Sequence, residues 1–212
     1  MKKETVAIFQ ELFARYPVLE CCADGIVQAY QTLEACYRNG GKVYFCGNGG
    51  SASDCEHIVG ELMKSFKKRR PLPQAFVENL PENDEGKLLQ ETLEGGLPAI
   101  SLCGHPALTS AFSNDKNPTL GFAQQLSVLA QAGDVLVTLS TSGNSKNCVY
   151  AAITAKAKNV KSVFLGGGTG GALKGLCDIS VVVPETETYK VQELHLPIYH
   201  CLCAMLEEEF FG

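Results

Sequence analysis

Two side chains that can bind or transfer protons, His57 and Glu61, stand four residues apart just after a glycine-rich stretch. At that spacing in a helix, both project from one face. The glycine-rich stretch, residues 47–51, follows an apolar run at 43–46 that is typical of a strand. A strand, a glycine turn and a helix start together form an anion site, because the first helical amides lack partners and glycines admit a ligand close to the backbone. The pattern therefore predicts a phosphate cradle beside two protonatable groups.

A second polar loop, STSGNS, carries four hydroxyl groups and a glycine immediately before a predicted helix at 146–158. Hydroxyls and free helix amides suit a phosphate, which needs several donors around its oxygens. Helix capping is the alternative, but it accounts for only one or two of these residues. We therefore predict that Ser140, Thr141, Ser142 and Ser145 bind phosphate.

Neither loop matches a nucleotide-binding motif. In the first loop, Ala52 stands where the dinucleotide fingerprint has its third glycine, and the next strand comes too late to supply the ribose-binding acid. Neither loop ends in the GK[ST] of a P-loop. We expect no nucleotide cofactor.

Five apolar runs, each bounded by turn residues, alternate with helical patterns and predict strands at 43–46, 97–102, 134–139, 160–165 and 179–183. This alternation predicts an α/β fold, with a parallel sheet and helices on both faces. Ligands of such sheets bind at the carboxyl ends of the strands, where both polar loops fall. A long helix is expected over 188–210, with a kink or a lost backbone hydrogen bond at Pro197.

The remaining segments are read as parts of a single domain, 1–212. Residues 1–40 form a helical leader with two amphipathic patterns, which we expect to pack on another subunit. Residues 67–97 contain prolines and then acidic residues, with too few apolar residues for a separate core, so they are read as an excursion before the second strand. The basic run at 64–70 is interpreted as a solvated helix end, with attraction of an anionic substrate as the alternative.

Composition excludes several classes of protein. The net charge of −5 argues against a nucleic-acid binder, and no apolar run is long enough to span a membrane. The first 20 residues lack a signal-peptide core, which predicts a cytoplasmic protein. The ten cysteines are irregularly spaced and contain no CxxC pair, which favours buried free thiols over disulfides or a cysteine zinc site.

Three segments in this order carry a family resemblance: CGNGGSASDCEH at 46–57, LSTSGNSKN at 139–147 and VQELHLPIYH at 191–200. Together they resemble the sugar isomerase (SIS) domain and, within it, the phosphoheptose isomerases. The resemblance covers nearly the whole chain outside 67–97. It implies a three-layer αβα sandwich with a five-stranded parallel sheet. It also implies a homotetramer with active sites between subunits, and interconversion of a ketose phosphate and an aldose phosphate.

The resemblance also implies roles for individual residues. Some family members hold a zinc ion with the residues that match His57, Glu61, Gln192 and His200. Imidazole and carboxylate are common zinc ligands, and Gln192 and His200 lie about two turns apart on roughly one side of the last helix. We hypothesise Glu61 as the catalytic base and His200 as its acid/base partner. The implied substrate-binding residues are Asn48, Gly49, Gly50, Ser51, Glu61, Asn114, Asp115, Ser140, Thr141, Ser142, Ser145 and Gln192.

The chain also departs from the family pattern. Lys64-Ser65-Phe66 stands where the family has a glycine, an arginine and an aromatic residue, and Lys190 replaces a second arginine, so a different sugar phosphate stays open. A non-catalytic SIS protein, acting as a sugar-phosphate sensor or a replication-initiator-binding platform, is the alternative. Such relatives can lose the histidine that matches His200, and its presence here favours the enzyme. His105 and His195 are expected to be structural, with His195 near enough to support the ligands.

Overall fold

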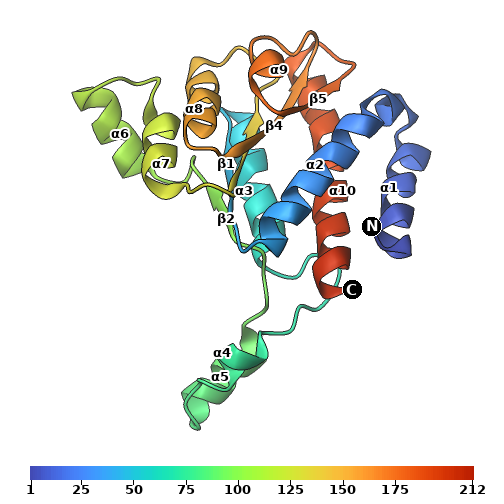
Figure 1. The fold of residues 1–212 in the computed structure, drawn as a ribbon, viewed down its shortest axis with the longest axis vertical. Helices are drawn as coiled ribbons and strands as arrows, with labels where there is room; N and C mark the ends of the chain where they lie inside the picture. The colour runs from blue at the N-terminus through green and yellow to red at the C-terminus, as the bar shows by residue number, and fades with distance from the viewer.

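A computed structural model describes all residues, 1–212, and contains one parallel sheet with the strand order β2-β1-β3-β4-β5 (Figure 1). Strand β1 lies between β2 and β3, so that Val43 lies opposite Ala99 of β2 and Val135 of β3. The strands are β1 (Val43–Cys46), β2 (Ala99–Ser101), β3 (Val135–Leu139), β4 (Lys161–Gly167) and β5 (Ile179–Val183). The helices are α1 (Lys3–Arg15), the 3₁₀ helix η1 (Pro17–Cys22), α2 (Ala23–Arg38), α3 (Gly50–Met63), α4 (Gln74–Val77), α5 (Asp84–Thr92), α6 (Pro106–Asp115), α7 (Gly121–Leu129), α8 (Lys146–Ala157), α9 (Leu173–Leu176) and α10 (Thr188–Phe211).

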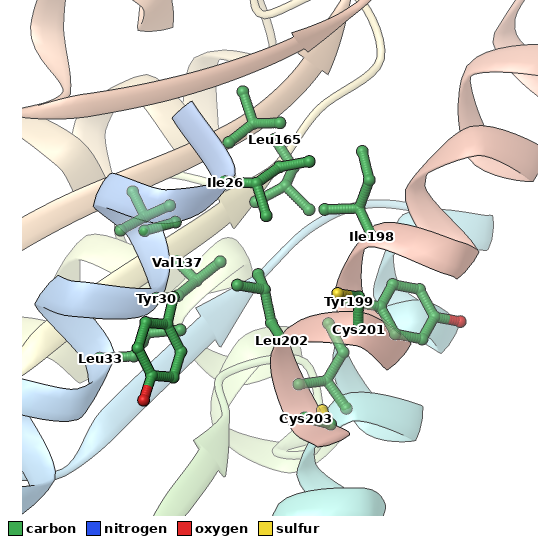
Figure 2. Packing of buried hydrophobic residues seen from close by; sticks show 14 of the residues in the cluster. Ile26, Tyr30, Leu33, Val137, Leu165, Ile198, Tyr199, Cys201, Leu202 and Cys203 are labelled. Carbon is green, nitrogen blue, oxygen red and sulfur yellow. The ribbon is translucent and has the colours of Figure 1, made fainter. Parts of the chain in front are cut away.

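The predicted five-stranded parallel sheet with helices on both faces is confirmed. Strand side chains alternate between the two faces, so Phe45 packs with α2, α3 and α10, whereas Tyr44 packs with α7, α8 and α9. Both faces are covered, which is why the strands are continuous apolar runs. Figure 2 shows side chains of α2, α10 and the strands meeting on the first face: Ile26, Tyr30, Leu33, Val137, Leu165, Ile198 and Leu202.

The predicted second strand is shorter in the structure than in the sequence pattern. It was expected over 97–102 and occupies Ala99–Ser101 at one edge of the sheet. Pro98 has no N–H group to donate, although its carbonyl still accepts a hydrogen bond from Val43 N at 3.1 Å. The strand therefore begins after the proline.

Helix α10 joins the two ends of the chain. It runs unbroken through Pro197, and near its end Glu209 accepts hydrogen bonds from the backbone N–H of Lys2 and the hydroxyls of Thr5 and Tyr30. These bonds fix α1 and α2 against the last helix.

The basic run is not simply a solvated helix end, as the sequence was interpreted. Helix α3 ends at Met63, before most of the run, and Arg70 is 1% exposed. Its guanidinium Nε donates to Glu207 Oε1 of α10 at 2.8 Å, and its other nitrogens donate to the carbonyls of Glu61 and Leu62. Glu207 also accepts hydrogen bonds from three backbone amides of this loop, those of Phe66, Lys67 and Lys68. The loop after Glu61 is thereby fastened to α10.

Residues 71–96 project away from the rest of the fold as an arm that contains α4 and α5 (Figure 1). Neither helix packs substantially on another element, and the backbone bond from Gly95 N to Arg70 O closes the base of the arm. Helix α5 begins at Asp84, where Asn83 caps it by accepting a hydrogen bond from Gly86 N. None of the helices is long and apolar enough to cross a bilayer.

Candidate active site

The glycine turn after β1 is built for a sharp change of direction into α3. Gly49 has φ of +55°, a conformation that favours glycine, and it directly precedes the first helical residue. No side chain caps the start of α3. The turn places Asp54, His57 and Glu61 along one face of the helix, at spacings of three and four residues.

His57 and Glu61 contact each other as the sequence predicted. His57 Nε2 lies 3.2 Å from Glu61 Oε1. The second carboxylate oxygen, Glu61 Oε2, is shielded from solvent and has no hydrogen-bond partner, and Lys64 Nζ lies 3.5 Å from it. Glu61 Oε2 is therefore shielded from solvent and accepts no hydrogen bond, and the Lys64 ammonium is the cation nearest to it.

The opposite edge of the His57 ring is held by Tyr199 of α10. The Tyr199 hydroxyl donates to Asp54 Oδ1 at 3.2 Å and lies 3.1 Å from His57 Nδ1. Because its only hydrogen goes to Asp54, His57 Nδ1 must carry the hydrogen of the second contact. The remaining oxygen, Asp54 Oδ2, is shielded without a partner, and burial raises the pKa of this carboxyl despite the bond from Tyr199.

This tautomer has a consequence for the His57–Glu61 contact. A neutral imidazole with hydrogen on Nδ1 presents a lone pair at Nε2, and that lone pair faces a carboxylate oxygen. Two acceptors 3.2 Å apart attract each other only when a proton or another cation is shared between them. In this tautomer, a proton or a metal cation between His57 Nε2 and Glu61 Oε1 would stabilise their contact.

His200 comes from α10 and completes an aromatic cluster over this pair. Its ring centroid lies 5.0 Å from that of His57, with the rings nearly perpendicular, and 5.5 Å from that of Phe66. The pKa of His200 is lowered, mainly by burial and then by the neighbouring His57, although the nearby Glu61 acts to raise it. Its Nε2 is shielded and without a partner. The predicted meeting of α3 and α10 residues is therefore present for His57, Glu61 and His200.

Gln192 meets α3 at a different point. A side chain at Gly50 would place its Cβ 2.7 Å from Gln192 Nε2, so the amide lies directly on the glycine turn. Gly50 must lack a side chain for this approach. No hydrogen bond links Gln192 to His57, Glu61 or His200. No three His, Cys, Asp or Glu side chains are grouped as a metal site in this conformation.

The STSGNS loop leads from β3 into α8 with several of its backbone amides free. Ser145 precedes the first residue of α8 but does not cap the helix, because its hydroxyl accepts from Ser140 Oγ at 3.1 Å. The backbone N–H groups of Ser142, Ser145 and Lys146 donate to no acceptor in the chain. Capping therefore does not account for the hydroxyls, whereas an anion at this helix start would satisfy these amides.

A second glycine-rich stretch, residues 166–171, packs directly against the STSGNS loop. Gly143 has φ of +66°, and a Cβ there would lie 1.9 Å from the carbonyl oxygen of Gly170. Gly167 N donates to Thr141 O at 3.1 Å. These contacts fix the loop, and position 143 admits only glycine.

The two polar loops are joined by a pair of amides. Asn48 Nδ2 donates to Asn147 Oδ1 at 3.0 Å, and Asn147 Nδ2 donates back to Asn48 Oδ1 at 2.7 Å. The first loop, from Asn48 to Ser51, and the STSGNS loop therefore line one edge of the sheet. Asn114 and Asp115 stand apart, because they end α6, which packs mainly on α7, and their hydrogen bond is to each other. Their role in substrate binding stays a prediction.

The comparisons with known proteins identify the family of the chain. The family model for the SIS domain matches residues 14–94 and 89–167. A phosphoheptose isomerase of Nitratiruptor sp. is 39% identical over 82% of this chain and 80% of its own length. The chain belongs to the phosphoheptose isomerase family. The family enzyme of Helicobacter hepaticus is 34% identical over 94% of this chain and 86% of its own. The solved phosphoheptose isomerase of Francisella tularensis superposes with a TM-score of 0.76, at 29% identity, covering 98% of this chain and all of the other.

The structure adds site residues that the sequence reasoning missed. Asp54 precedes His57 by three residues, a spacing that would have placed it on the same helix face. Tyr199 stands next to His200, and no spacing rule ties it to a residue 142 positions earlier. Asn147 lies within the quoted LSTSGNSKN segment, but only the fold shows that it pairs with Asn48.

Replacing Tyr199 by phenylalanine is expected to lower kcat by about 10- to 100-fold, the usual effect of removing a partner that orients a functional histidine. The hydroxyl that holds the Nδ1 hydrogen of His57 is lost, while the buried ring stays. Turnover and thermal melting are measured together, with exposed Tyr189→Phe as the matched control. Unchanged turnover in a folded Tyr199→Phe variant would show that His57 does not need this orientation.

His195 is fully buried, as expected of a structural residue, and it makes the fold sensitive to acid. Its Nε2 lies 3.2 Å from Gly166 O, and burial lowers its pKa from 6.5 to about 4. Between these pKa values the unfolded chain binds a proton that the folded chain does not, so acidification lowers stability. Between pH 7.5 and 5 we expect the wild type to lose about 2 kcal/mol more than His195→Gln in urea unfolding. An equal loss of unfolding free energy in the wild type and in His195→Gln would contradict this prediction.

Proposed function

We propose that the protein interconverts sedoheptulose 7-phosphate and D-glycero-D-manno-heptose 7-phosphate, an aldose–ketose isomerisation. The observation that carries the proposal is the meeting of His57 and Glu61 of α3 with His200 of α10, beside the STSGNS loop with its free backbone amides. The names of the relatives in Nitratiruptor and Helicobacter hepaticus support the same activity.

The reaction moves one proton between adjacent carbons through an enediol, so it needs a base at the carbon and an acid/base group at the oxygens. Glu61 is assigned as the base, because its Oε2 is shielded from solvent and accepts no hydrogen bond, with only the Lys64 ammonium 3.5 Å away. His200 is assigned as the partner, because its lowered pKa keeps the imidazole neutral near pH 7 and able to both give and take a proton. Asp54 and Tyr199 hold His57 in one tautomer beside the base.

The sugar phosphate is held at the other side of the site. The phosphate is assigned to the STSGNS loop, through the hydroxyls of Ser140, Thr141, Ser142 and Ser145 and the free amides at the start of α8. The glycine turn at 48–51 forms the floor, on which the sugar lies near Gln192. Fixing the phosphate sets the carbon skeleton against Glu61 and supplies the orientation on which catalysis depends.

A zinc ion is part of this proposal. The donor set of His57, Glu61, Gln192 and His200 suits zinc, and Glu61 Oε2 and His200 Nε2 are shielded atoms without partners, which a cation would satisfy. When bound, zinc would polarise the substrate oxygens. Zinc content by elemental analysis, compared between wild type and His57→Gln, tests the assignment independently of activity. Equal zinc in both proteins would contradict it.

We also propose a homotetramer, as the family resemblance implies, in which the leader helices α1 and α2 contribute to subunit contacts. The proposal for the reaction is tested by adding sedoheptulose 7-phosphate, with and without zinc, and following the aldose product by NMR. Product formation is expected. Thermal stabilisation by the sugar phosphate without conversion in either condition would favour the non-catalytic sensor instead.

A further inference from the structure

The arm at residues 71–96 exposes apolar side chains that nothing in its own chain covers. Leu88 is 63% exposed, Leu93 45% and Phe76 44%. Helices α4 and α5 have four and nine residues, below the length at which an isolated helix is stable in water, about 12–15 residues. A short helical pair that shows its apolar residues to solvent is typical of a segment that binds a surface.

The charge of the arm restricts what that surface can be. The arm contains six carboxylates and one lysine, Lys87, so it accounts for the entire net charge of −5 of the chain. None of its carboxylates forms an ion pair within the chain. The charge excludes an anionic membrane surface and calls for a cationic, apolar partner.

The chain itself carries a surface of that kind. A groove of about 390 Å³ lies between α1 and α10, with Ile8, Leu12, Phe66 and Leu196 among its apolar walls. Arg15 and Lys67 also line it, along with one carboxylate, Glu11. Arg15, Lys67 and the nearby exposed Arg69 have no carboxylate partner in the chain.

The groove and the base of the arm are neighbours. Phe66 and Lys67 line the groove, and the arm leaves the fold only a few residues later, directed away from the body (Figure 1). The arm begins beside this groove but does not occupy it. Two copies related by a two-fold axis can therefore exchange their arms. Each groove then receives the partner's arm, as closed symmetric dimers require.

We propose that the arm of one copy docks into the α1–α10 groove of a second copy of this chain. Its leucines cover the apolar walls, and its carboxylates pair with Arg15, Lys67 and Arg69. His200 also lines the groove, so the docked arm closes one side of the candidate active site. This last consequence, and it alone, rests on the proposed function, in which His200 is an acid/base group.

Photo-crosslinking tests the contact without reference to activity. Leu88 is replaced by p-benzoylphenylalanine in isotope-labelled chains, which are mixed with unlabelled chains, irradiated and digested. We expect crosslinks between labelled and unlabelled chains, at peptides that contain residues 8–16 or 196–204. The same replacement at exposed Val128 of α7 is the control and should not reach these peptides. Crosslinks within one chain only, at other segments, or at no segment would overturn the proposal.

The oligomeric mass gives a second measurement. The double variant Leu88→Asp/Leu89→Asp, in which both side chains are already exposed, is expected to lower the mass in light scattering at least two-fold at equal concentration. Val128→Asp/Leu129→Asp, an equally exposed pair on α7, should keep the wild-type mass. An unchanged mass in the arm variant would also overturn the proposal. Both experiments detect contacts between chains and do not depend on activity. A wild type without isomerase activity would therefore reject the isomerase assignment, while the proposed arm contact would still be accepted or rejected by the crosslinking and mass measurements alone.

Discussion

Glutamine in place of Glu61 is expected to lower kcat by about 10²- to 10⁴-fold, the range that a positioned acid or base contributes. Glutamine fills the same space but cannot take the proton from carbon. The buried position of Glu61 Oε2, without a hydrogen-bond partner, makes this the side chain on which the proposed proton transfer depends. Turnover is measured by NMR with sedoheptulose 7-phosphate, and binding by thermal shift with the same sugar phosphate, which should persist.

The matched control is Glu56→Gln. Glu56 lies on the same helix, is exposed, and makes no ion pair or side-chain hydrogen bond in the chain. We expect its variant to turn over at the wild-type rate. Near-normal turnover in a folded Glu61→Gln protein would refute the assignment of Glu61 as the base.

Replacing Arg70 by methionine is expected to lower the free energy of unfolding by about 3 kcal/mol, at the lower end of the cost of breaking a buried ion pair. The two partners, Arg70 and Glu207, are each 1% exposed. Methionine would also leave the carbonyls of Glu61 and Leu62 without their donors. Glu207 would keep its three backbone amides, which limits the loss.

Urea unfolding at fixed protein concentration measures this change. The control is Arg69→Met, since Arg69 is exposed and unpaired and an ordinary surface substitution changes stability by less than about 0.5 kcal/mol. Equal stability of the two variants would mean that the Arg70–Glu207 contact contributes nothing net. A lowered kcat in Arg70→Met at a temperature where it stays folded would show that the contact also positions Glu61.

Burial raises the pKa of Glu207, but the amides of Phe66 and Lys67 and the guanidinium of Arg70 outweigh burial and hold this pKa below its ordinary value. A carboxylate with a lowered folded pKa stabilises the fold above its unfolded pKa and loses that contribution as the pH falls. His195 acts in the same direction, because its pKa is also lowered. Both groups therefore make the protein less stable in acid.

The fold was predictable because its elements are strongly periodic and are separated by glycine, proline and serine. The strands at 43–46 and 179–183 have the predicted limits, since each is a short, mostly apolar run closed by a glycine or a proline. The His57–Glu61 contact was predictable as well, because both residues lie on one helix and need no tertiary information. Local pattern sufficed for these features.

The remaining parts of the site depend on contacts between residues far apart in the sequence. Arg70 was interpreted together with its basic neighbours, because nothing in its local sequence separates a buried guanidinium from four exposed cations. Tyr199 and Asp54 are joined across 145 positions, and the family resemblance placed His200 rather than its neighbour at the site. The arm was recognised as an excursion from its composition, but its projection from the fold follows from the absence of packing partners.

The hydrogen bonds of α10 also bear on how the chain folds during synthesis. Glu207 fastens the loop after α3, and Glu209 fastens α1 and α2, so the last few residues complete contacts with segments made long before. The ribosome makes these segments before α10, and until α10 follows, α1 lacks the helix on which it mainly packs. We therefore expect nascent chains to depend on chaperones until α10 has been made, and variants truncated before Glu207 to be degraded rather than partly active.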